Sequence, residues 1–156
     1  MGYTHYWILD TNIKNKQQVE KNYQKAISDC HKIILWAKKN VVNLSGYSAH
    51  TKLGTYNGIK VNGVKEDGHE TFYLLDHFYR YGTEDHDCFN FCKTNRKEYD
   101  IVVVACLSVL KHRLKDAIKV SSDGDAADWL DGINLARKVT NLKIHNPIGT
   151  GLKLVG

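Results

Sequence analysis

The sequence predicts an α+β domain in which about three helices pack against a small, mostly antiparallel β-sheet. Three observations support this class. Apolar residues that recur every three or four positions indicate amphipathic helices. Short runs of β-branched and aromatic residues indicate strands, and the Asn-Gly and Asp-Gly pairs between them indicate tight turns. The 156 residues fit a single domain, spanning residues 1–156.

The first strand and the first helix have the clearest patterns. The chain begins MGYTHYW, and residues 3–9 are expected to form a strand because they are β-branched or aromatic. Asp10 or Asn12 is expected to begin the next helix. Apolar residues recur at helical spacing over 19–37, with Lys, Gln and Glu on the other face. Residues 38–40, Lys-Lys-Asn, are expected to end that helix.

The middle of the chain is rich in turn residues. We expect residues 58–64 to pair with residues 70–75 as a short antiparallel meander. Residues 79–90 are polar and without a period, which is typical of a loop. The segment 99–116 predicts a second helix. Its first half is apolar nearly all round, so we expect it to lie buried at the centre, with the sheet against it.

The boundaries of the later elements rest on capping signals. Asn95 with Glu98 three residues later has the form of a capping box before the second helix. Ser122 or Asp123 is expected to begin a third helix. A short strand is expected at residues 117–120, and another could follow Asn141. The predicted order is therefore β-α-β-β-α-β-α.

Composition limits the partners. The formal charge is +5 and the pI is about 8.9, which favours an anionic partner. The basic residues of the chain are interspersed with acidic ones and do not form a single stripe, so we do not expect nucleic acid to be the partner. The longest apolar run, Ile101 to Leu107, is too short to span a membrane, and the N-terminus lacks a signal peptide. Cys30 and Cys106 lie in apolar helical patterns and are expected to be buried thiols.

Motifs for several kinds of chemistry are missing from the sequence. It contains no Walker loop, no Gly-x-Gly-x-x-Gly fingerprint and no Gly-x-Ser-x-Gly. His86, Cys88 and Cys92 are close in sequence, but one Cys-x3-Cys without a second pair is a weak zinc signal. We therefore expect no metal, no cofactor and no catalytic residue.

Two stretches carry residues suited to binding. Tyr3, His5 and Trp7 share one face of the first strand, where they either enter the core or line a pocket. Lys93, Thr94 and Arg96 precede a helix N-terminus, where free N–H groups and the helix dipole attract anions. These cations could instead be simply solvated, and the stretch SSDGD at 121–125 could either cap a helix or hydrogen-bond a ribose.

Together, MGYTHYW, HETFYL at 69–74, FCKTNRKEYD at 91–100, KH at 111–112 and VSSDGD at 120–125 carry a resemblance that spans nearly the whole chain. The chain resembles a family of small uncharacterised proteins from bacteriophages and prophages. It departs from that pattern at Glu98, where we would expect Pro, and at Arg113, where we would expect a second His. The resemblance implies a phage gene and hence the host bacterial cytoplasm, but it assigns no activity.

We therefore expect a binding protein rather than an enzyme. It would bind a nucleotide-like anionic small molecule and could in this way sequester a bacterial immune signal. Aromatic rings would take the base, cations the phosphates and carboxylates the ribose. The expected ligand-binding residues are Tyr3, His5, Trp7, Glu70, Thr71, Lys93, Thr94, Arg96, Ser121, Ser122 and Asp123. Two alternatives stay open: an enzyme that cleaves such a ligand with His5, Glu70 or His112 as acid–base groups, and a protein that inhibits a host defence factor by binding it. Whether the chain is a homo-oligomer is also open.

Overall fold

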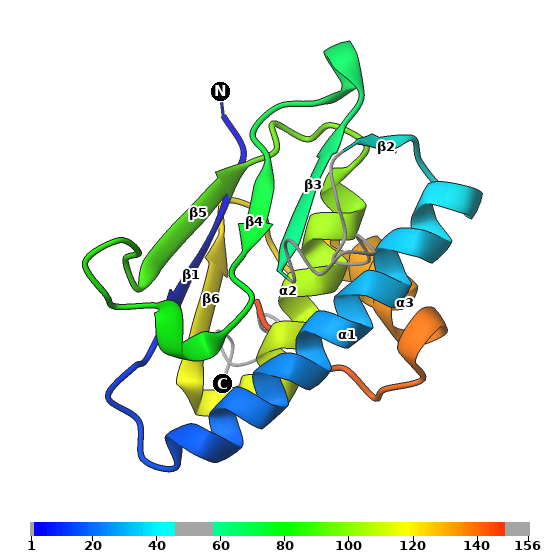
Figure 1. Ribbon diagram of the computed structural model, residues 1–156. Coiled ribbons are helices and arrows are strands. Elements are labelled where there is room, and N and C mark those ends of the chain that lie inside the picture. The colour runs from blue at the N-terminus through cyan, green and yellow to red at the C-terminus, as the bar shows by residue number, and fades with distance from the viewer. Residues whose placement is uncertain (1, 46–57, 149–156) are drawn as a thin grey trace, which may run out of the picture.

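The computed structural model describes residues 2–45 and 58–148, and it shows an α+β fold. Strands β1, β4, β5 and β6 lie on one side of the molecule and the helices on the other, whereas β2 lies beside the end of α1 (Figure 1). The helices are α1 (Lys16–Asn40), α2 (Asp100–Leu114) and α3 (Leu130–Thr140). The strands are β1 (Thr4–Leu9), β2 (Leu44–Ser45), β3 (Ile59–Gly63), β4 (Phe72–Leu74), β5 (Phe89–Lys93) and β6 (Ile118–Ser122).

The strands form two antiparallel sheets of three strands each, in the orders β5-β1-β6 and β2-β3-β4. The predicted meander is confirmed as the pairing of β3 with β4. The two sheets meet where the N–H of Glu70 donates to the carbonyl oxygen of Lys93. Trp7 of the first sheet and Phe72 of the second then pack together, with ring centroids 5.3 Å apart.

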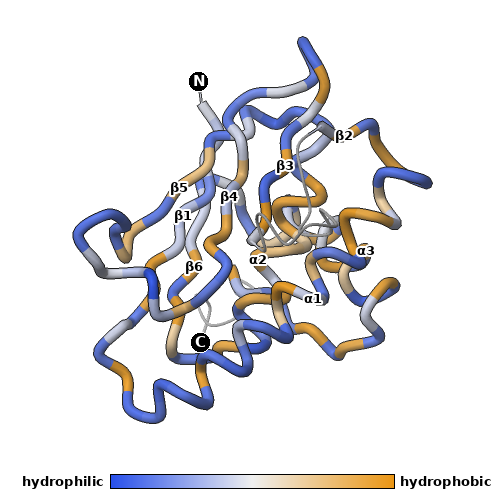
Figure 2. The backbone as a smooth tube through the Cα atoms, in the orientation of Figure 1, coloured by the Kyte–Doolittle hydropathy of each residue, from blue (hydrophilic) through white to orange (hydrophobic). Residues whose placement is uncertain are grey.

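Helix α2 is the centre of the core, as its nearly all-round apolar pattern predicts. It packs against both α1 and α3 and contacts β6. Hydrophobic residues accordingly concentrate in the middle of the molecule, whereas the connecting loops are hydrophilic (Figure 2). The predicted buried thiols are confirmed: Cys30 on α1 and Cys106 on α2 are both fully buried, and burial raises the pKa of Cys30. None of the described helices is both long and apolar enough to cross a membrane.

The expected helix starts were wrong in each case. Asn15, in a left-handed conformation, precedes α1, so neither Asp10 nor Asn12 is its cap. Asn95 is also left-handed, and α2 begins only at Asp100, so the capping box with Glu98 does not form.

Near the C-terminus, Ser122 belongs to β6 and Asp123 follows it directly, whereas α3 begins eight residues after Ser122, at Leu130. The strand expected at residues 117–120 is therefore found as β6, displaced toward the C-terminus. No strand follows Asn141 within the described residues, which end at position 148.

The predicted loop over 79–90 was wrong at its end, because β5 begins at Phe89. In β5 the apolar rings of Phe89 and Phe91 point to solvent and Cys92 points to the core. Phe89, Asn90 and Phe91 alternate as in a strand, but the apolar side of this alternation faces solvent instead of the core.

Candidate functional site

A chain of buried and half-buried polar groups lies beneath the inner face of β1. The imidazole of His5 is fully buried, and its Nε2–H donates to Oδ1 of Asp100 at 2.6 Å. On the other side of the ring, Nδ1 of His5 and Oγ of Ser122 are hydrogen-bonded at 2.7 Å. The hydroxyl of Thr94, also buried, donates to the same Asp100 oxygen at 2.5 Å. Buried polar groups are costly unless they are paired, and this network pairs them.

Three secondary-structure elements and the turn after β5, which carries Thr94, supply this network. His5 comes from β1 and Ser122 from the neighbouring position on β6, while Asp100 is the first residue of α2. The carboxylate at the start of α2 is favourably placed for the helix dipole. The ring of Trp129 packs edge-on against the His5 ring, at 5.1 Å between centroids. The network thus ties the sheet to the N-terminal end of the central helix.

A pocket of about 220 Å³ opens directly above this network. We name it the Tyr3–Arg96 pocket, and its lining is Tyr3, Arg96, Lys97, Glu98, Asp100, Ile101, Val104, Asp128, Asp131 and Gly132. The hydrogen-bonded network below the pocket is its support. Two residues of the pocket wall contact that network: the Tyr3 ring packs edge-on against His5 at 5.1 Å, and the Asp100 carboxylate is hydrogen-bonded to His5.

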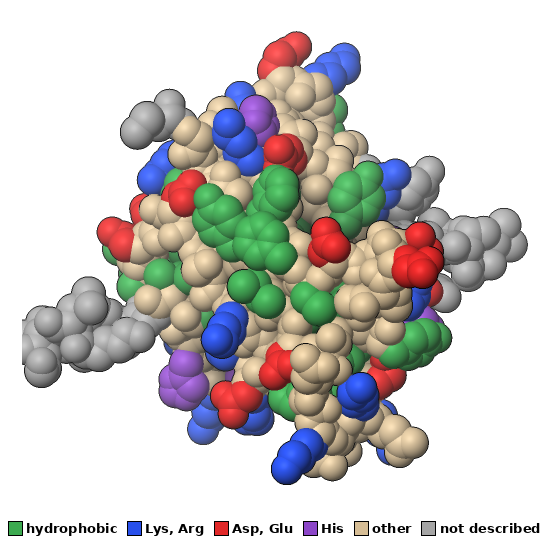
Figure 3. Space-filling model, turned by 90° about the vertical axis from the view of Figure 1, so that its left-hand side faces the viewer, with side chains coloured by type: hydrophobic (Ala, Val, Ile, Leu, Met, Phe, Trp, Pro, Cys, Tyr) green, Lys and Arg blue, Asp and Glu red, His purple; other side chains and the backbone are tan. Residues whose placement is uncertain are grey.

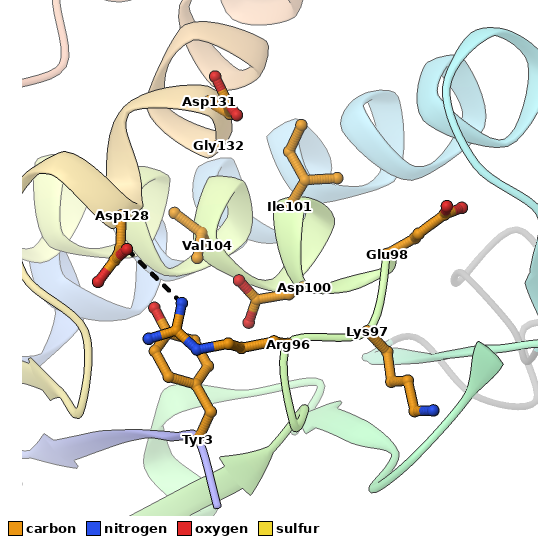
Figure 4. Close-up of a pocket in the computed structure, with 10 residues that line it drawn as sticks. All are labelled: Tyr3, Arg96, Lys97, Glu98, Asp100, Ile101, Val104, Asp128, Asp131 and Gly132. Atoms are coloured by element: carbon orange, nitrogen blue, oxygen red, sulfur yellow. Dashed lines mark ion pairs between the residues drawn. The ribbon is translucent and has the colours of Figure 1, made fainter. Parts of the chain in front are cut away.

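Arg96 lies across the mouth of the pocket. Its guanidinium carbon is 4.0 Å from the centre of the Tyr3 ring, and Nη1 is 3.6 Å from Oδ1 of Asp128. Figure 4 shows Arg96, Tyr3, Asp100 and Asp128 gathered together, whereas Lys97 and Glu98 point away from them. Because the Arg96 side chain is still 63% exposed, one face of the guanidinium is free to meet a ligand.

The backbone that carries Arg96 is unusual. Asn95 and Arg96 both have left-handed φ angles, 54° and 60°, which an arginine rarely adopts. The N–H groups of Thr94 and Asn95 both donate to the carbonyl oxygen of Tyr3 at 3.1 Å. These bonds hold the strained turn against the start of β1. The backbone therefore places Arg96 next to the Tyr3 ring. Strain of this kind concentrates at functional sites.

The environment of the pocket shifts the pKa of two of its groups. Burial, with a smaller contribution from the Asp100 carboxylate, raises the pKa of Tyr3 to about 12. The hydrogen bond from the backbone of Asp125, helped by the nearby Arg96 guanidinium, lowers the pKa of Asp128. At neutral pH the pocket therefore presents a neutral phenol and an ionised carboxylate.

Two glycines allow the chain to approach the pocket closely. A Cβ on Gly132 would lie 2.4 Å from Cγ1 of Val104, so α3 can pack against α2 here only without a side chain. A Cβ on Gly124 would lie 2.1 Å from the Tyr3 hydroxyl oxygen.

Five of the predicted residues converge at this site: Tyr3, His5, Thr94, Arg96 and Ser122. Trp7 does not. It is 2% exposed and packs on Phe72 in the core, with no polar partner for its Nε1 among the described residues.

The other five predicted residues lie outside the pocket. Glu70 accepts the N–H of Lys93 at 2.7 Å, and Thr71 accepts a bond from Asn62 at 3.0 Å. Asp123 accepts bonds from the N–H of Thr4 and the hydroxyl of Tyr6. Lys93 and Ser121 pair with Thr4 and Tyr6, and so point to the side of the sheet away from the network.

Sequence reasoning missed Asp100, Asp128 and Trp129. Asp100 falls within the second predicted helix, and the sequence pattern assigns no role in binding to Asp128 or Trp129. A lone carboxylate that opens an otherwise apolar helix was the available signal for Asp100.

No family model, curated protein or solved structure matches the chain. Among the described residues, no group of three or more His, Cys, Asp or Glu side chains could hold a metal ion. The candidate site therefore has to be interpreted from its own geometry.

Proposed function

We propose that this protein binds a nucleotide-derived small molecule in the Tyr3–Arg96 pocket and does not convert it. The observation that carries the proposal is the guanidinium of Arg96, held between the Tyr3 ring and the Asp128 carboxylate with one face exposed. A planar guanidinium can stack on a base, and its N–H groups can bind a phosphate or carbonyl oxygen.

The carboxylates of the pocket set the chemistry of the rest of the ligand. The lining holds two cations, Arg96 and Lys97, and the four carboxylates Glu98, Asp100, Asp128 and Asp131. This balance is more acidic than the cation-rich site that the sequence suggested. Carboxylates accept hydrogen bonds, so they suit ribose hydroxyls and amino groups and disfavour a triphosphate. We therefore propose a ligand with few phosphates.

The size of the pocket points the same way. Its volume of about 220 Å³ is below the ~300–1,000 Å³ of most small-molecule sites. It would hold one nucleoside-sized part of a ligand, and the remainder would extend over Arg96 to solvent. With the resemblance to phage proteins, this fits a protein that sequesters a nucleotide immune signal of the bacterial host.

A thermal-shift series tests the proposal. AMP, 3′,5′-cyclic nucleotides and ADP-ribose would be added to the wild type, to Arg96→Ala and to Lys138→Ala. The last is a matched control, because Lys138 also lies over an aromatic ring, that of Trp36, outside the pocket. A ligand at 100 times its Kd should raise the wild-type Tm by about 5–10 °C.

We expect Arg96→Ala to lose most of this shift and Lys138→Ala to keep it. Mass spectrometry of the ligand released by heating should return it unchanged. No shift with any of these nucleotides, or an equal shift in Arg96→Ala, would contradict the proposal.

A second candidate function is cleavage of the same ligand, and one specific observation favours it. Ser122, His5 and Asp100 form the hydrogen-bonded series found in serine hydrolases. Against it, His5 is fully buried, and Oγ of Ser122 accepts the N–H of Gly124 at 2.9 Å. A changed product after incubation, abolished by Ser122→Ala, would favour cleavage over binding.

A further inference from the structure

The β5-β1-β6 sheet has a second surface that the pocket does not use. We call it the outer face. It is formed by side chains that alternate with those of the buried network, namely Thr4, Tyr6, Ile8, Phe89, Phe91, Lys93, Lys119 and Ser121. The register places Tyr6 beside Phe91 and Ile8 beside Phe89. Ile8, Phe89 and Phe91 are 43%, 49% and 56% exposed. Isolated exposed apolar residues are common, whereas a contiguous group of them is often functional.

The rings of the outer face form one continuous group. Tyr6 stacks near Phe89, with centroids 6.2 Å apart and planes inclined by 27°. Phe89 and Phe91 follow at 6.0 Å and 37°. Figure 3 shows hydrophobic side chains gathered on the side of the molecule where β5 lies, with charged side chains of both signs around them. A row of partly exposed rings offers stacking to other rings.

The charges within the outer face favour an anionic partner. Lys93 and Lys119 lie on the two edge strands, at opposite ends of the face. Neither forms an ion pair within the described residues. The nearby carboxylate of Asp123 is already engaged, since it accepts hydrogen bonds from the N–H of Thr4 and the hydroxyl of Tyr6. The strand positions of the outer face therefore carry two cations and no carboxylate.

From these observations we infer that the outer face binds single-stranded nucleic acid. Unstacked bases would lie on Tyr6, Phe89 and Phe91, and phosphates would meet Lys93 and Lys119. Aromatic rings on a sheet flanked by cations are how sequence-tolerant single-strand binding works. The alternating charges of the sequence argued against nucleic acid, but they did not reveal that these rings are exposed.

The size of the apolar patch favours this partner over a second copy of the chain. About half of each of three apolar side chains is exposed, on the order of 300 Å². A stable dimer buries ~800 Å² per partner, of which roughly 450 Å² is apolar, more than this patch supplies. Stacking of two or three bases needs no more than the rings provide.

Fluorescence anisotropy with labelled dT and rU oligonucleotides of about 12 residues, at low salt, tests the inference. The double variant Phe89→Ala/Phe91→Ala should weaken affinity at least ten-fold. Leu35→Ala, which truncates an equally exposed residue on α1, should leave it unchanged. Lys93→Gln/Lys119→Gln should reduce the slope of log affinity against log salt by about one to two.

The pocket and the outer face can fail separately. Arg96→Ala should bind the oligonucleotides like the wild type, so loss of nucleotide binding there leaves this inference intact. Absence of binding to both oligonucleotides at low salt would overturn it, as would equal affinity in the phenylalanine double variant. Sedimentation that shows wild-type self-association, lost in that double variant, would overturn it in favour of a second copy.

Discussion

The two faces of the β5-β1-β6 sheet have the reverse of the polarity that folding alone would select: polar groups lie on the inner face and aromatic rings on the outer face. The inner face places His5, Asp100, Thr94 and Ser122 in or next to the core, where each needs a polar partner. The outer face leaves aromatic rings in water. Replacing the inner polar groups by apolar ones and the outer rings by polar ones would be the simpler solution for stability. Departures of this kind are expected where a protein has a function to perform.

The largest expected effect is the difference in stability cost between truncating a core ring and truncating a ring of the outer face. Phe72→Ala removes a fully buried ring that packs on Trp7, and we expect it to lower the free energy of unfolding by about 3–5 kcal/mol. Phe91→Ala removes the same atoms from the outer face and should cost less than about 1 kcal/mol. Urea denaturation measures both, and equal costs would mean that Phe91 is covered in solution.

Adjacent residues on β1 provide the second comparison. His5→Phe deprives the Asp100 carboxylate of its imidazole partner, so we expect a loss of about 2–4 kcal/mol. Tyr6→Phe removes only a hydroxyl that donates to Asp123 near the surface, and should change stability by less than ~0.5 kcal/mol. Adding Asp100→Leu to His5→Phe should restore part of the loss, because it removes the unpaired charge. Additive losses in this double variant would show that the network is not coupled.

The smallest expected effect is on alkaline stability. The pKa of Tyr3 is raised from 10.0 to about 12 in the folded state. The folded protein therefore keeps this proton at a pH where the unfolded chain releases it, and stability falls as pH rises above 10. We expect Tyr3 to account for about 1 kcal/mol of the loss between pH 9 and pH 11. In Tyr3→Phe this part of the loss should disappear, and an unchanged pH profile would place the Tyr3 hydroxyl in water.

Much of the fold could be predicted because its signals are local. Helices α1 and α2, strand β1 and the β3-β4 pair each follow from residues adjacent in sequence. The division into two sheets depends on pairing between distant strands, which no local pattern records. Strand β5 was missed although Phe89 and Phe91 alternate with Asn90, and no local pattern records that these two rings face solvent.

The candidate site was predicted in part, for a geometric reason. Tyr3, His5 and Trp7 share a face, but Trp7 is four residues from Tyr3, about 13 Å along an extended strand. The strand therefore carries Trp7 out of the site and into the core. Thr94 and Arg96 were found through their position before a helix. Ser121 and Ser122 could not be told apart, since the strand that contains Ser122 sends neighbouring residues to opposite faces.

The central position of β1 means that the pocket support and the outer face share one length of chain. A single-residue insertion or deletion within Thr4–Leu9 would move all the side chains on one side of it to the opposite surface. Related proteins could therefore vary each surface by substitution, whereas a change in the length of β1 would disturb both surfaces at once.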